Sequence, residues 1–592
     1  MKELEYPFDA AYIIKKRKSL KKALLADGTS RIRKKIAVFG GSTTSDIVKT
    51  LELFLLDAGI EPEFYESEYA QYFQDAMFPD ETLLSFKPDI VFIHTTNRNV
   101  TDWPEMTDTT EQIDEKLHTE INRFTAMWKS IAEKFHCPII QNNFEMPLYR
   151  LLGSRDAWDI HGRTNFLTRL NEAFYAYARE NESFYIHDLN FVSADYGLKE
   201  WSNPLFWNMY KYAMCFEAIP SFAFSVSHII KSIFGKNKKA LALDLDNTLW
   251  GGVVGDDGVD GIEIGQETGV SQSYYEFQTY VKQLKSLGIV LTVCSKNDHE
   301  NAIAGLNHPE GALRPDDFVI IKANWENKDR NIAETAAELN ILPDSIVFAD
   351  DNPAEREIVR TQIKGAAVPD MDGVENYITT IDRSGFFEVT TFSEDDLKRN
   401  EMYKKNALRA AEMASFGDYN DYLKSLEMHA VIDDFIPVYL ARITQLTNKT
   451  TRRYTPAEME SVFEDDGYIR LYGKLIDKFG DNGVVSVVIG RKNGMALDID
   501  LWLMSCRVLK RDMEFAMLDR LVERCREVGV ETINGYYYPT AKNKMVSDLF
   551  GRFGFTKTEE HEDGSTVWQL RVADYKPQNH VIEVFGNDHA EA

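Results

Sequence analysis

One stretch of sequence decides the fold of this chain: Ala240-Leu-Ala-Leu-Asp244-Leu-Asp246-Asn-Thr-Leu-Trp250-Gly-Gly-Val-Val254. A short apolar run, of the kind found in buried strands, ends in two carboxylates that are two residues apart. Side chains at this spacing leave a strand on the same side, and the two glycines that follow keep the approach open. We expect one of these two carboxylates, Asp244 or Asp246, to be a nucleophile while its neighbour manages the proton, because a carboxylate can attack phosphorus and form an acyl phosphate.

Two neighbouring carboxylates repel each other, so the motif needs a compensating positive charge. Mg2+ is the expected cation, because it prefers oxygen ligands and would also neutralise a substrate phosphate. The sequence therefore predicts a magnesium site that includes Asp244 and Asp246.

Three later segments carry the groups that such a site still lacks. An apolar run from 288 to 294 ends at Ser295, whose hydroxyl can donate a hydrogen bond to phosphate. Lys328 stands at the expected start of a helix, where its charge could screen the nucleophile and bind phosphate. A third apolar run ends in Asp350 and Asp351, which we expect to complete the metal ligands.

Each group has a simpler explanation when it is taken alone. The first acidic pair could be a solvated turn, Ser295 a turn hydroxyl and Lys328 a solvated helix residue. Asp350 and Asp351 could cap a helix that has a proline near its start. Their shared placement argues against these alternatives, because every group follows a predicted strand of a βα unit. Open parallel sheets bind their ligands at that edge.

These four segments resemble the haloacid dehalogenase superfamily of phosphotransferases. Two runs are similar to its FkbH-like subgroup: Leu243-Asp-Leu-Asp-Asn-Thr-Leu-Trp-Gly-Gly-Val-Val-Gly-Asp-Asp-Gly258 and Val293-Cys-Ser-Lys-Asn-Asp298. The similarity extends to the carboxyl-terminal region, in the runs Arg442–Thr450, Thr451–Tyr454, Asp477–Gly483 and Trp502–Arg507.

The resemblance implies a role for each of the acidic and basic residues. Asp244 would be the nucleophile and Asp246 the general acid and base. Ser295 and Lys328 would bind the phosphoryl group. The metal site would comprise Asp244, Asp246, Asp350 and Asp351.

The same resemblance implies a reaction beyond phosphate removal. FkbH-like proteins take the acyl phosphate 1,3-bisphosphoglycerate and deliver its glyceryl unit, as a thioester, to the phosphopantetheine arm of an acyl carrier protein. Cys294 is our candidate for a thioester carrier, because a neighbouring cation such as Lys296 would favour its thiolate. Cys506 is the second candidate. For either one, an inert buried thiol is the commoner outcome.

Composition limits the class of protein. A chain of 592 residues with 44% apolar and 27% charged residues should form about three soluble domains. No apolar run is long enough for a bilayer, and the amino terminus lacks a signal-peptide pattern. The five scattered cysteines fit a reducing compartment. We therefore predict a cytoplasmic protein with no membrane partner.

The net charge of -27 argues against a nucleic-acid partner, since affinity for phosphate backbones depends on Lys and Arg. It also complicates docking of a carrier protein, because carrier proteins are typically acidic too. Candidate basic surfaces are Arg452 with Arg453, and Arg507 with Lys510 and Arg511. Solvated loop or helix edges would explain these pairs equally well.

We predict an α/β multidomain protein with three parts. Residues 1–233 would form a parallel α/β domain that resembles SGNH hydrolases. Residues 234–388 would form a Rossmann-like haloacid dehalogenase core without a large cap. Residues 389–592 would form a helical connector and an acetyltransferase-like α+β domain.

For each flanking domain the sequence leaves open whether the domain is active. Ser42 follows a strand in Gly40-Gly-Ser-Thr43, as an esterase nucleophile would, but the segment 203–208 lacks the expected histidine. We therefore expect a scaffolding or docking domain, with an active esterase as the alternative. In the third domain, Lys510 and Asp512 stand where the FkbH-like pattern has glycines. The short insert expected before Thr451 is also missing, so binding of coenzyme A or pantetheine there is in doubt.

Three classes of function stay open. The first is a Mg2+-dependent phosphatase and glyceryl transferase that serves a carrier protein. The second is a phosphatase of a small soluble phosphate ester. The third is a non-catalytic module for biosynthetic assembly, which the presence of all the core residues disfavours.

Overall fold

The computed structural model describes the chain except residues 393–396, 414–415, 448–453, 455, 506–507, 509–510, 540–542, 544–545 and 588–592. The chain forms two compact units. The first comprises residues 1–238 and 369–391, and the second comprises residues 239–368 and 392–592. Among the described residues we find no helix whose length and hydrophobicity would let it cross a bilayer.

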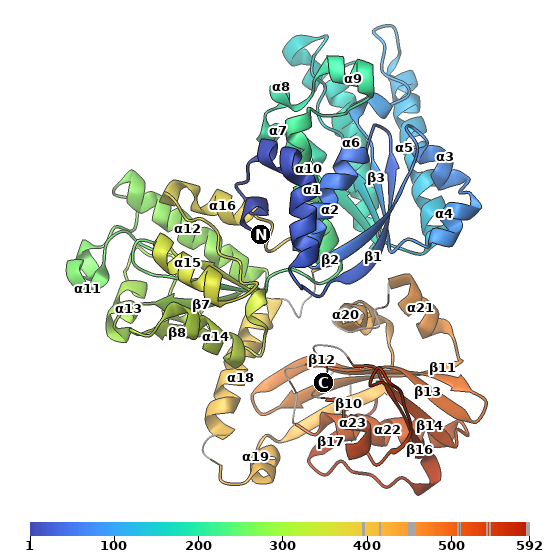
Figure 1. Cartoon of the computed structure of the whole chain (residues 1–592), viewed down its shortest axis with the longest axis vertical. Coiled ribbons are helices and arrows are strands. Elements are labelled where there is room, and N and C mark those ends of the chain that lie inside the picture. The colour runs from blue at the N-terminus through green and yellow to red at the C-terminus, as the bar shows by residue number, and fades with distance from the viewer. Residues whose placement is uncertain are drawn as a thin grey trace. The chain divides into compact units, whose positions relative to one another are not determined.

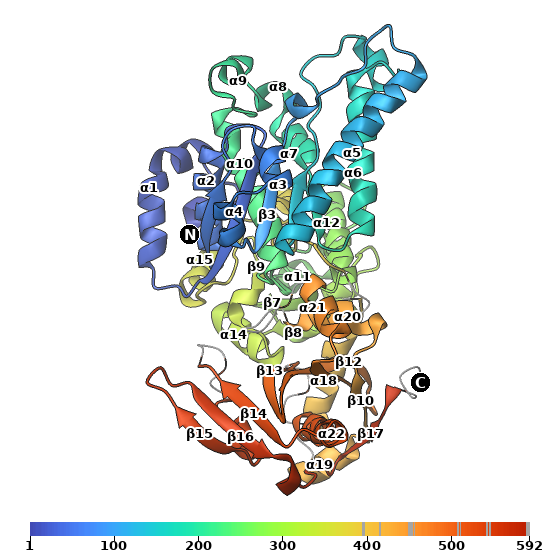
Figure 2. The ribbon, with the colours of Figure 1, turned by 90° about the vertical axis from the view of Figure 1, so that its right-hand side faces the viewer.

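The first unit contains a five-stranded parallel sheet in the order β2-β1-β3-β4-β5 (Figure 1). Its strands are β1 (Ile32–Gly40), β2 (Ile60–Glu66), β3 (Ile90–His94), β4 (Ile139–Asn142) and β5 (Phe184–His187). Its main helices are α1 (Ala10–Ala26), α2 (Ser45–Asp57), α5 (Thr110–Phe135), α6 (Arg163–Glu180) and α10 (Ile219–Ile233). Alternate strand residues feed two cores, one with α1, α2 and α10 and one with α5 and α6. Figures 1 and 2 both show α5 and α6 side by side.

The second unit contains a four-stranded parallel sheet in the order β8-β7-β6-β9. Its strands are β6 (Ala240–Leu243), β7 (Val290–Ser295), β8 (Ile320–Ala323) and β9 (Ile346–Ala349). Its main helices are α12 (Gly269–Ser286), α13 (His299–Leu306), α14 (Lys328–Glu338) and α15 (Pro353–Gln362). Residues of β6, β7 and β9 are fully buried, as expected for the short apolar runs of a covered parallel sheet.

The same unit contains an eight-stranded sheet in the order β15-β16-β14-β13-β12-β11-β10-β17. Its strands are β10 (Met428–Asp434), β11 (Tyr468–Asp477), β12 (Gly480–Asn493), β13 (Ala496–Met504), β14 (Thr532–Tyr537), β15 (Thr556–Glu560), β16 (Thr566–Arg571) and β17 (Ile582–Phe585). Helix α22 (Met513–Glu527) lies in the core on one face, and α20 (Pro437–Thr447) lies in the core on the other. Most neighbouring pairs are antiparallel, but β10 and β17 pair in parallel, and so do β13 and β14 over three residues.

Helix α18 (Arg399–Met413) connects the two sheets of the second unit through polar contacts. Near its start, the buried Asn400 side chain donates to the carbonyl oxygens of Lys285 (3.2 Å) and Ile289 (3.0 Å). Towards its end, Arg409 forms a buried ion pair with Asp477 at 2.7 Å. Buried hydrogen-bonded groups of this kind fix the position of a helix, because leaving them unpaired is costly.

Residues 369–391 belong to the first unit, although we predicted that 369–388 would belong to the catalytic domain. Contacts with the rest of the first unit hold this segment. The amide of Lys238 donates to Phe386 O at 3.0 Å, Ser232 Oγ donates to Glu388 O at 3.0 Å, and Arg383 pairs with Asp195 at 2.8 Å. These contacts join residues far apart in sequence, so no local pattern could have predicted them.

The described elements are those of a multidomain α/β protein, as predicted. The sequence pattern predicts strands at 35–39, 62–65, 89–93 and 138–140. The first two lie within β1 and β2, and the last two overlap β3 and β4 but begin one residue before them. The pattern also predicts a helix at 438–446 and strands at 484–488 and 496–504, which lie within α20, β12 and β13.

Candidate active site

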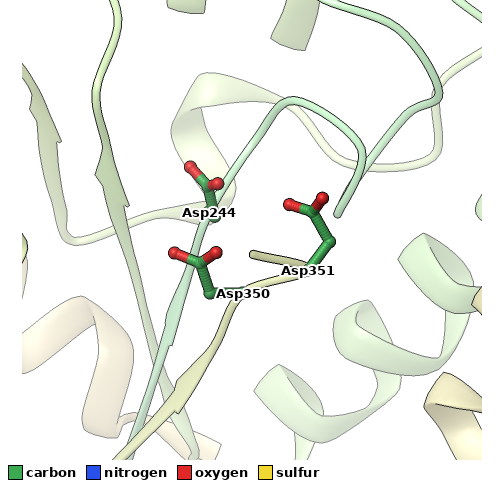
Figure 3. A group of neighbouring side chains, drawn as sticks. All are labelled: Asp244, Asp350 and Asp351. Atoms are coloured by element: carbon green, nitrogen blue, oxygen red, sulfur yellow. The ribbon is translucent and has the colours of Figure 1, made fainter. Parts of the chain in front are cut away.

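Two neighbouring strands of the four-stranded sheet carry an acidic cluster. Leu243 at the end of β6 pairs with Ala349 at the end of β9, and the Asp244 amide donates to Ala349 O at 3.0 Å. Asp244, Asp350 and Asp351 each offer a carboxylate oxygen, and these oxygens all lie within 4.8 Å of one another. Figure 3 shows the three side chains gathered where the two strands end. The predicted acids of two motifs are thus brought together.

Lys328 supplies the positive charge of this cluster. It is the first residue of α14, and its Nζ lies 2.9 Å from Asp244 Oδ2 and 2.5 Å from Asp350 Oδ2. Burial lowers the pKa of Lys328, but the charges of the two carboxylates outweigh burial and raise it. Lys328 is therefore a fixed cation at neutral pH.

Three carboxylates and one ammonium leave two negative charges uncompensated. Burial, and then the charge of Asp244, raise the pKa of Asp350 to about 6 despite the nearby Lys328. The same two causes raise the pKa of Asp351. An all-oxygen donor set with this excess charge fits a hard divalent cation such as Mg2+, which Asp244, Asp350 and Asp351 would hold.

Asp246 has a different environment from the other acids. Its Oδ1 accepts from Trp250 Nε1 at 2.9 Å and from the Val254 amide at 3.1 Å. Its Oδ2 accepts from Asn297 Nδ2 at 2.9 Å. Burial is the main cause that raises the pKa of Asp246. Among the described residues, the acids whose carboxylate oxygens all lie within 4.8 Å of one another are Asp244, Asp350 and Asp351, and Asp246 is not one of them. Its predicted parts in proton transfer and in metal binding stay predictions.

A glycine of α13 makes room for the tryptophan that contacts Asp246. A β-carbon at Gly305 would lie 2.8 Å from the ring of Trp250, closer than side chains approach in real structures. The indole therefore packs against bare helix backbone, which fixes its Nε1 towards the Asp246 carboxylate.

Ser295 lies where the sequence predicted it, at the carboxyl end of β7 on the same sheet edge as the acids. It is buried, and its carbonyl oxygen accepts from the amide of Asn324 at 3.2 Å. That bond ties the loop after β7 to the loop that precedes Lys328. Ser295 and Lys328 therefore belong to neighbouring segments of one edge.

Cys294 is in a position that weighs against the carrier role predicted for it. The thiol is fully buried in an apolar cluster that includes Ile332 and Phe348, and its Sγ lies 3.6 Å from Lys328 O. Burial raises the pKa of Cys294. Thiolate is therefore disfavoured, and no attack on a substrate would be open to it. Cys506, the second candidate, lies outside the described residues.

Four residues support the acids in ways that we did not predict. Trp250 and Asn297 bind the Asp246 carboxylate, as described above. Thr248 Oγ1 accepts from the Asp351 amide at 3.1 Å, and Arg356 Nη1 donates to the carbonyl oxygens of Asp350 (3.0 Å) and Asp351 (2.8 Å). Three of the four stand within the motifs themselves or close after them, so proximity to the acids is the one sequence signal that could have indicated them.

Ser42 follows β1 in the first unit, as predicted, but no described residue is hydrogen-bonded to it as an esterase's base would be. The side chain is buried, and in the part of the chain that the structure describes its Oγ has no hydrogen-bond partner. The nearby strand-end histidines have other contacts, His94 with Asn142 (3.2 Å) and His187 with Ser225 (3.0 Å). Burial lowers the pKa of His94 to about 4 and that of His187 to about 3.

The basic residues proposed for carrier docking are mostly beyond what can be placed. Arg452, Arg453, Arg507 and Lys510 lie outside the described residues, as does the junction at Thr451. Arg511 is buried and its Nη1 lies 3.1 Å from the Asp477 carboxylate, so it belongs to an internal ion pair. Asp512, at the expected glycine position before α22, has a positive φ of 60°.

Comparison with known proteins agrees with this architecture. The model of the FkbH N-terminal domain family matches residues 35–231. A crystal structure from Bacteroides fragilis, described as the N-terminal part of BF1531 containing a phosphatase domain complexed with Mg, is 30% identical with a TM-score of 0.58. The alignment covers 64% of this chain and 99% of that one. None of the curated proteins compared with the chain matches it.

Other solved structures align with smaller shares of the chain. The ribosomal-protein-S18-alanine N-acetyltransferase of Escherichia coli is 12% identical and has a TM-score of 0.21, over 26% of this chain and 99% of that one. A GNAT-family acetyltransferase from Streptococcus pneumoniae is 15% identical and has a TM-score of 0.20, over 24% and 99%. We draw nothing from scores this low.

The parallel sheet with its acidic edge places this chain among proteins with a phosphatase-type α/β domain. More narrowly, the chain belongs to the FkbH-like family, as its sequence motifs indicated.

Proposed function

We propose that this protein is a Mg2+-dependent phosphatase or phosphotransferase whose nucleophile is Asp244. The carrying observation is the cluster of Asp244, Asp350 and Asp351 around the ammonium of Lys328. The Mg that was bound in the similar phosphatase domain from Bacteroides fragilis supports the choice of metal.

The residues suggest a two-step reaction. A carboxylate oxygen of Asp244 attacks the phosphorus atom, and the bond from phosphorus to the leaving oxygen breaks as Asp246 gives that oxygen a proton. Asp246 then takes a proton from water, which hydrolyses the aspartyl phosphate. Ser295 and Lys328 hold the phosphoryl oxygens. A bound Mg2+ would supply charge neutralisation for the phosphoryl group.

For the physiological reaction we propose that Asp244 removes the ester phosphate of 1,3-bisphosphoglycerate and that the glyceryl unit is loaded onto an acyl carrier protein. In the loading step the carrier's pantetheine thiol loses its proton and attacks the acyl carbon, and the bond from that carbon to the acyl-phosphate oxygen breaks, so the second phosphate leaves as inorganic phosphate. Membership of the FkbH-like family supports this substrate and this partner. Because Cys294 is buried, we assign the thioester to the pantetheine thiol of the carrier itself. A small soluble phosphate ester remains the second candidate substrate, and a non-catalytic assembly role the third.

The flanking domains would then serve docking. We propose that the first unit is an SGNH-like scaffold, since Ser42 has no histidine partner among the described contacts. We propose an acetyltransferase-like fold for the eight-stranded sheet, supported by its order and by the position of α22.

The deciding experiment incubates the protein with Mg2+, 1,3-bisphosphoglycerate and phosphopantetheinylated carrier protein, and then weighs the intact carrier. A mass gain of one glyceryl unit supports transfer, and phosphate release alone supports a simple phosphatase. If neither product forms, the result supports a scaffold. Asp244→Asn should abolish phosphate release while its circular dichroism stays that of the parent, and an active Asp244→Asn enzyme would overturn the proposed nucleophile.

A further inference from the structure

An exposed tryptophan stands beside the candidate active site. Trp325 lies in the loop between β8 and α14, three residues before Lys328, and its side chain is 71% exposed. A large aromatic ring in this exposed position adds little to the hydrophobic core, because little of its surface is buried.

The loop that carries Trp325 is held firmly. The indole Nε1 donates to Asp298 Oδ1 at 2.9 Å. The preceding residue, Asn324, donates from its amide to Ser295 O at 3.2 Å and accepts at its side-chain oxygen from Asn331 Nδ2 at 2.8 Å. The ring is therefore held in its exposed position. Because its side chain is already restricted, little conformational entropy would be lost when a ligand binds to it.

These bonds place the ring between two loops of the acidic edge. Asp298, which holds the indole, directly follows Asn297, and the Asn297 side chain donates to Asp246 at 2.9 Å. On the other side, Lys328 reaches Asp244 at 2.9 Å. Trp325 thus lies in a loop of the acidic edge, between the segment that carries Asn297 and the segment that begins at Lys328.

We propose that Trp325 is a specificity-determining residue whose ring packs against the organic group attached to the transferred phosphoryl. This inference rests on the proposed function, because it assigns the substrate class of that same site. The favoured substrates carry a group long or flat enough to cover an indole face, whereas a two-carbon acyl phosphate is too short.

The energetic consequence is specific to binding. The ring would contact a part of the substrate that does not react, so the contact is equally strong in the ground state and the transition state. Its removal should therefore raise KM and leave kcat unchanged.

The test compares benzoyl phosphate with acetyl phosphate, two acyl phosphates that differ in the size of the acyl group. Trp325→Ala should raise KM for benzoyl phosphate about tenfold and change KM for acetyl phosphate by less than about twofold. Inhibition by inorganic phosphate should not change, because the phosphoryl site is untouched. Trp325→Phe, which keeps a ring and loses the hydrogen bond, should retain most of the selectivity.

The matched control is Trp158→Ala, which removes an indole of similar exposure (68%) from the first unit and should change neither KM. Equal changes for both substrates in Trp325→Ala would mean that the indole merely supports its loop and would overturn the proposal. Unchanged values for both would overturn it as well.

A separate measurement distinguishes this inference from the proposed function. The proposed function is decided by phosphate release from 1,3-bisphosphoglycerate, independently of these two test compounds. If the parent hydrolyses neither acyl phosphate, calorimetric titration of the Asp244→Asn protein with benzoyl phosphate and Mg2+ decides about the ring. Adding Trp325→Ala should weaken that binding about tenfold. Undiminished binding, or no binding by the Asp244→Asn protein, would overturn the inference.

Discussion

Asp351 is the most exposed of the three clustered acids, and its contribution can be separated from catalysis. Asp351→Asn should raise the Mg2+ concentration needed for half-maximal phosphate release by about tenfold or more, because one ligand charge is lost. Activity at saturating Mg2+ should fall much less. The measurement is a Mg2+ titration of initial rates. Glu355→Gln, which removes an acid paired with Lys296 at 2.7 Å, is the control, and equal titration curves for both variants would contradict the metal assignment.

Lys328 has a structural role that is visible without substrate. Lys328→Met leaves Asp244 and Asp350 buried without their cation, which should lower the free energy of unfolding by about 3–5 kcal/mol in EDTA. Excess Mg2+ should restore part of the loss, since it would take over the missing positive charge. Urea denaturation measures both values.

The control for that variant is Lys322→Met, which removes a lysine paired with Glu334 and Glu338 on a more exposed surface. It should cost about 1 kcal/mol or less and show no recovery with Mg2+. If both variants lose the same stability, the cluster does not depend on Lys328 in the way the distances suggest.

Among single residues, the sequence predicted the charged groups of the site but not the side chains that hydrogen-bond to them. Asp244, Lys328 and Asp350 were recognisable because each falls at the end of an apolar run or the start of a helix. The contact of Trp250 with Asp246 was not, since it depends on how the turn after β6 closes. We expected a charged neighbour, Lys296, to favour the Cys294 thiolate, whereas the fold buries the thiol in an apolar core cluster.

Helix α13 positions Asp246 through Trp250, and this link between elements can be tested. Gly305→Ala puts a methyl group 2.8 Å from the Trp250 ring, so the indole must shift and the Asp246 carboxylate loses the hydrogen bond from Trp250. Because small misplacements of catalytic groups are costly, kcat should fall by about tenfold or more while the Mg2+ requirement stays constant.

Gly255→Ala is the control for that change, because its new methyl group would lie 3.4 Å from the nearest atom, the Asn301 amide nitrogen. It should keep near-parental kcat. A Gly305→Ala enzyme with parental kcat would show that Trp250 does not position Asp246.

Strands and helices were predictable where a strand is buried on both faces. The parallel strands read as continuous apolar runs because both faces are covered, and the helices between them follow. The sequence indicated neither where helix α16 (Tyr377–Arg383) lies nor which residue it pairs with. Its Arg383 pairs with Asp195, which is distant in sequence, and such pairs leave no periodic trace.

The stability of the whole molecule should depend on pH through Glu145 in the first unit. Burial raises the pKa of Glu145 to about 7, and Thr96 Oγ1 donates to its carboxyl group. In the unfolded chain this acid ionises near its ordinary pKa, so the folded state binds the extra proton between these two values. Its contribution therefore becomes less favourable as pH rises from about 4.5 to 7, by about 3 kcal/mol in total.

Glu145→Gln isolates this effect, because the amide does not titrate. Urea denaturation of both proteins at pH 5 and pH 8 should show the parent losing up to about 3 kcal/mol more than the variant on going to the higher pH. Other titrating groups, such as the buried His94, cancel in the difference. A constant difference between the proteins would mean that Glu145 ionises normally in the fold.

At the scale of the whole chain, composition and motifs sufficed for an α/β multidomain protein. They could not predict that residues 369–391 return to the first unit, because that choice depends on long-range contacts such as Ser232 with Glu388.

That return has a consequence for biosynthesis. A ribosome releases the phosphatase-type segment, residues 239–368, before the final piece of the first unit emerges. The first unit must therefore wait, incomplete and without the bonds that Lys238 and Ser232 make to Phe386 and Glu388, while the inserted segment is already free to fold. Nascent chains of this protein pass through an interval in which residues 239–368 can fold before the first unit, which begins the chain, is complete.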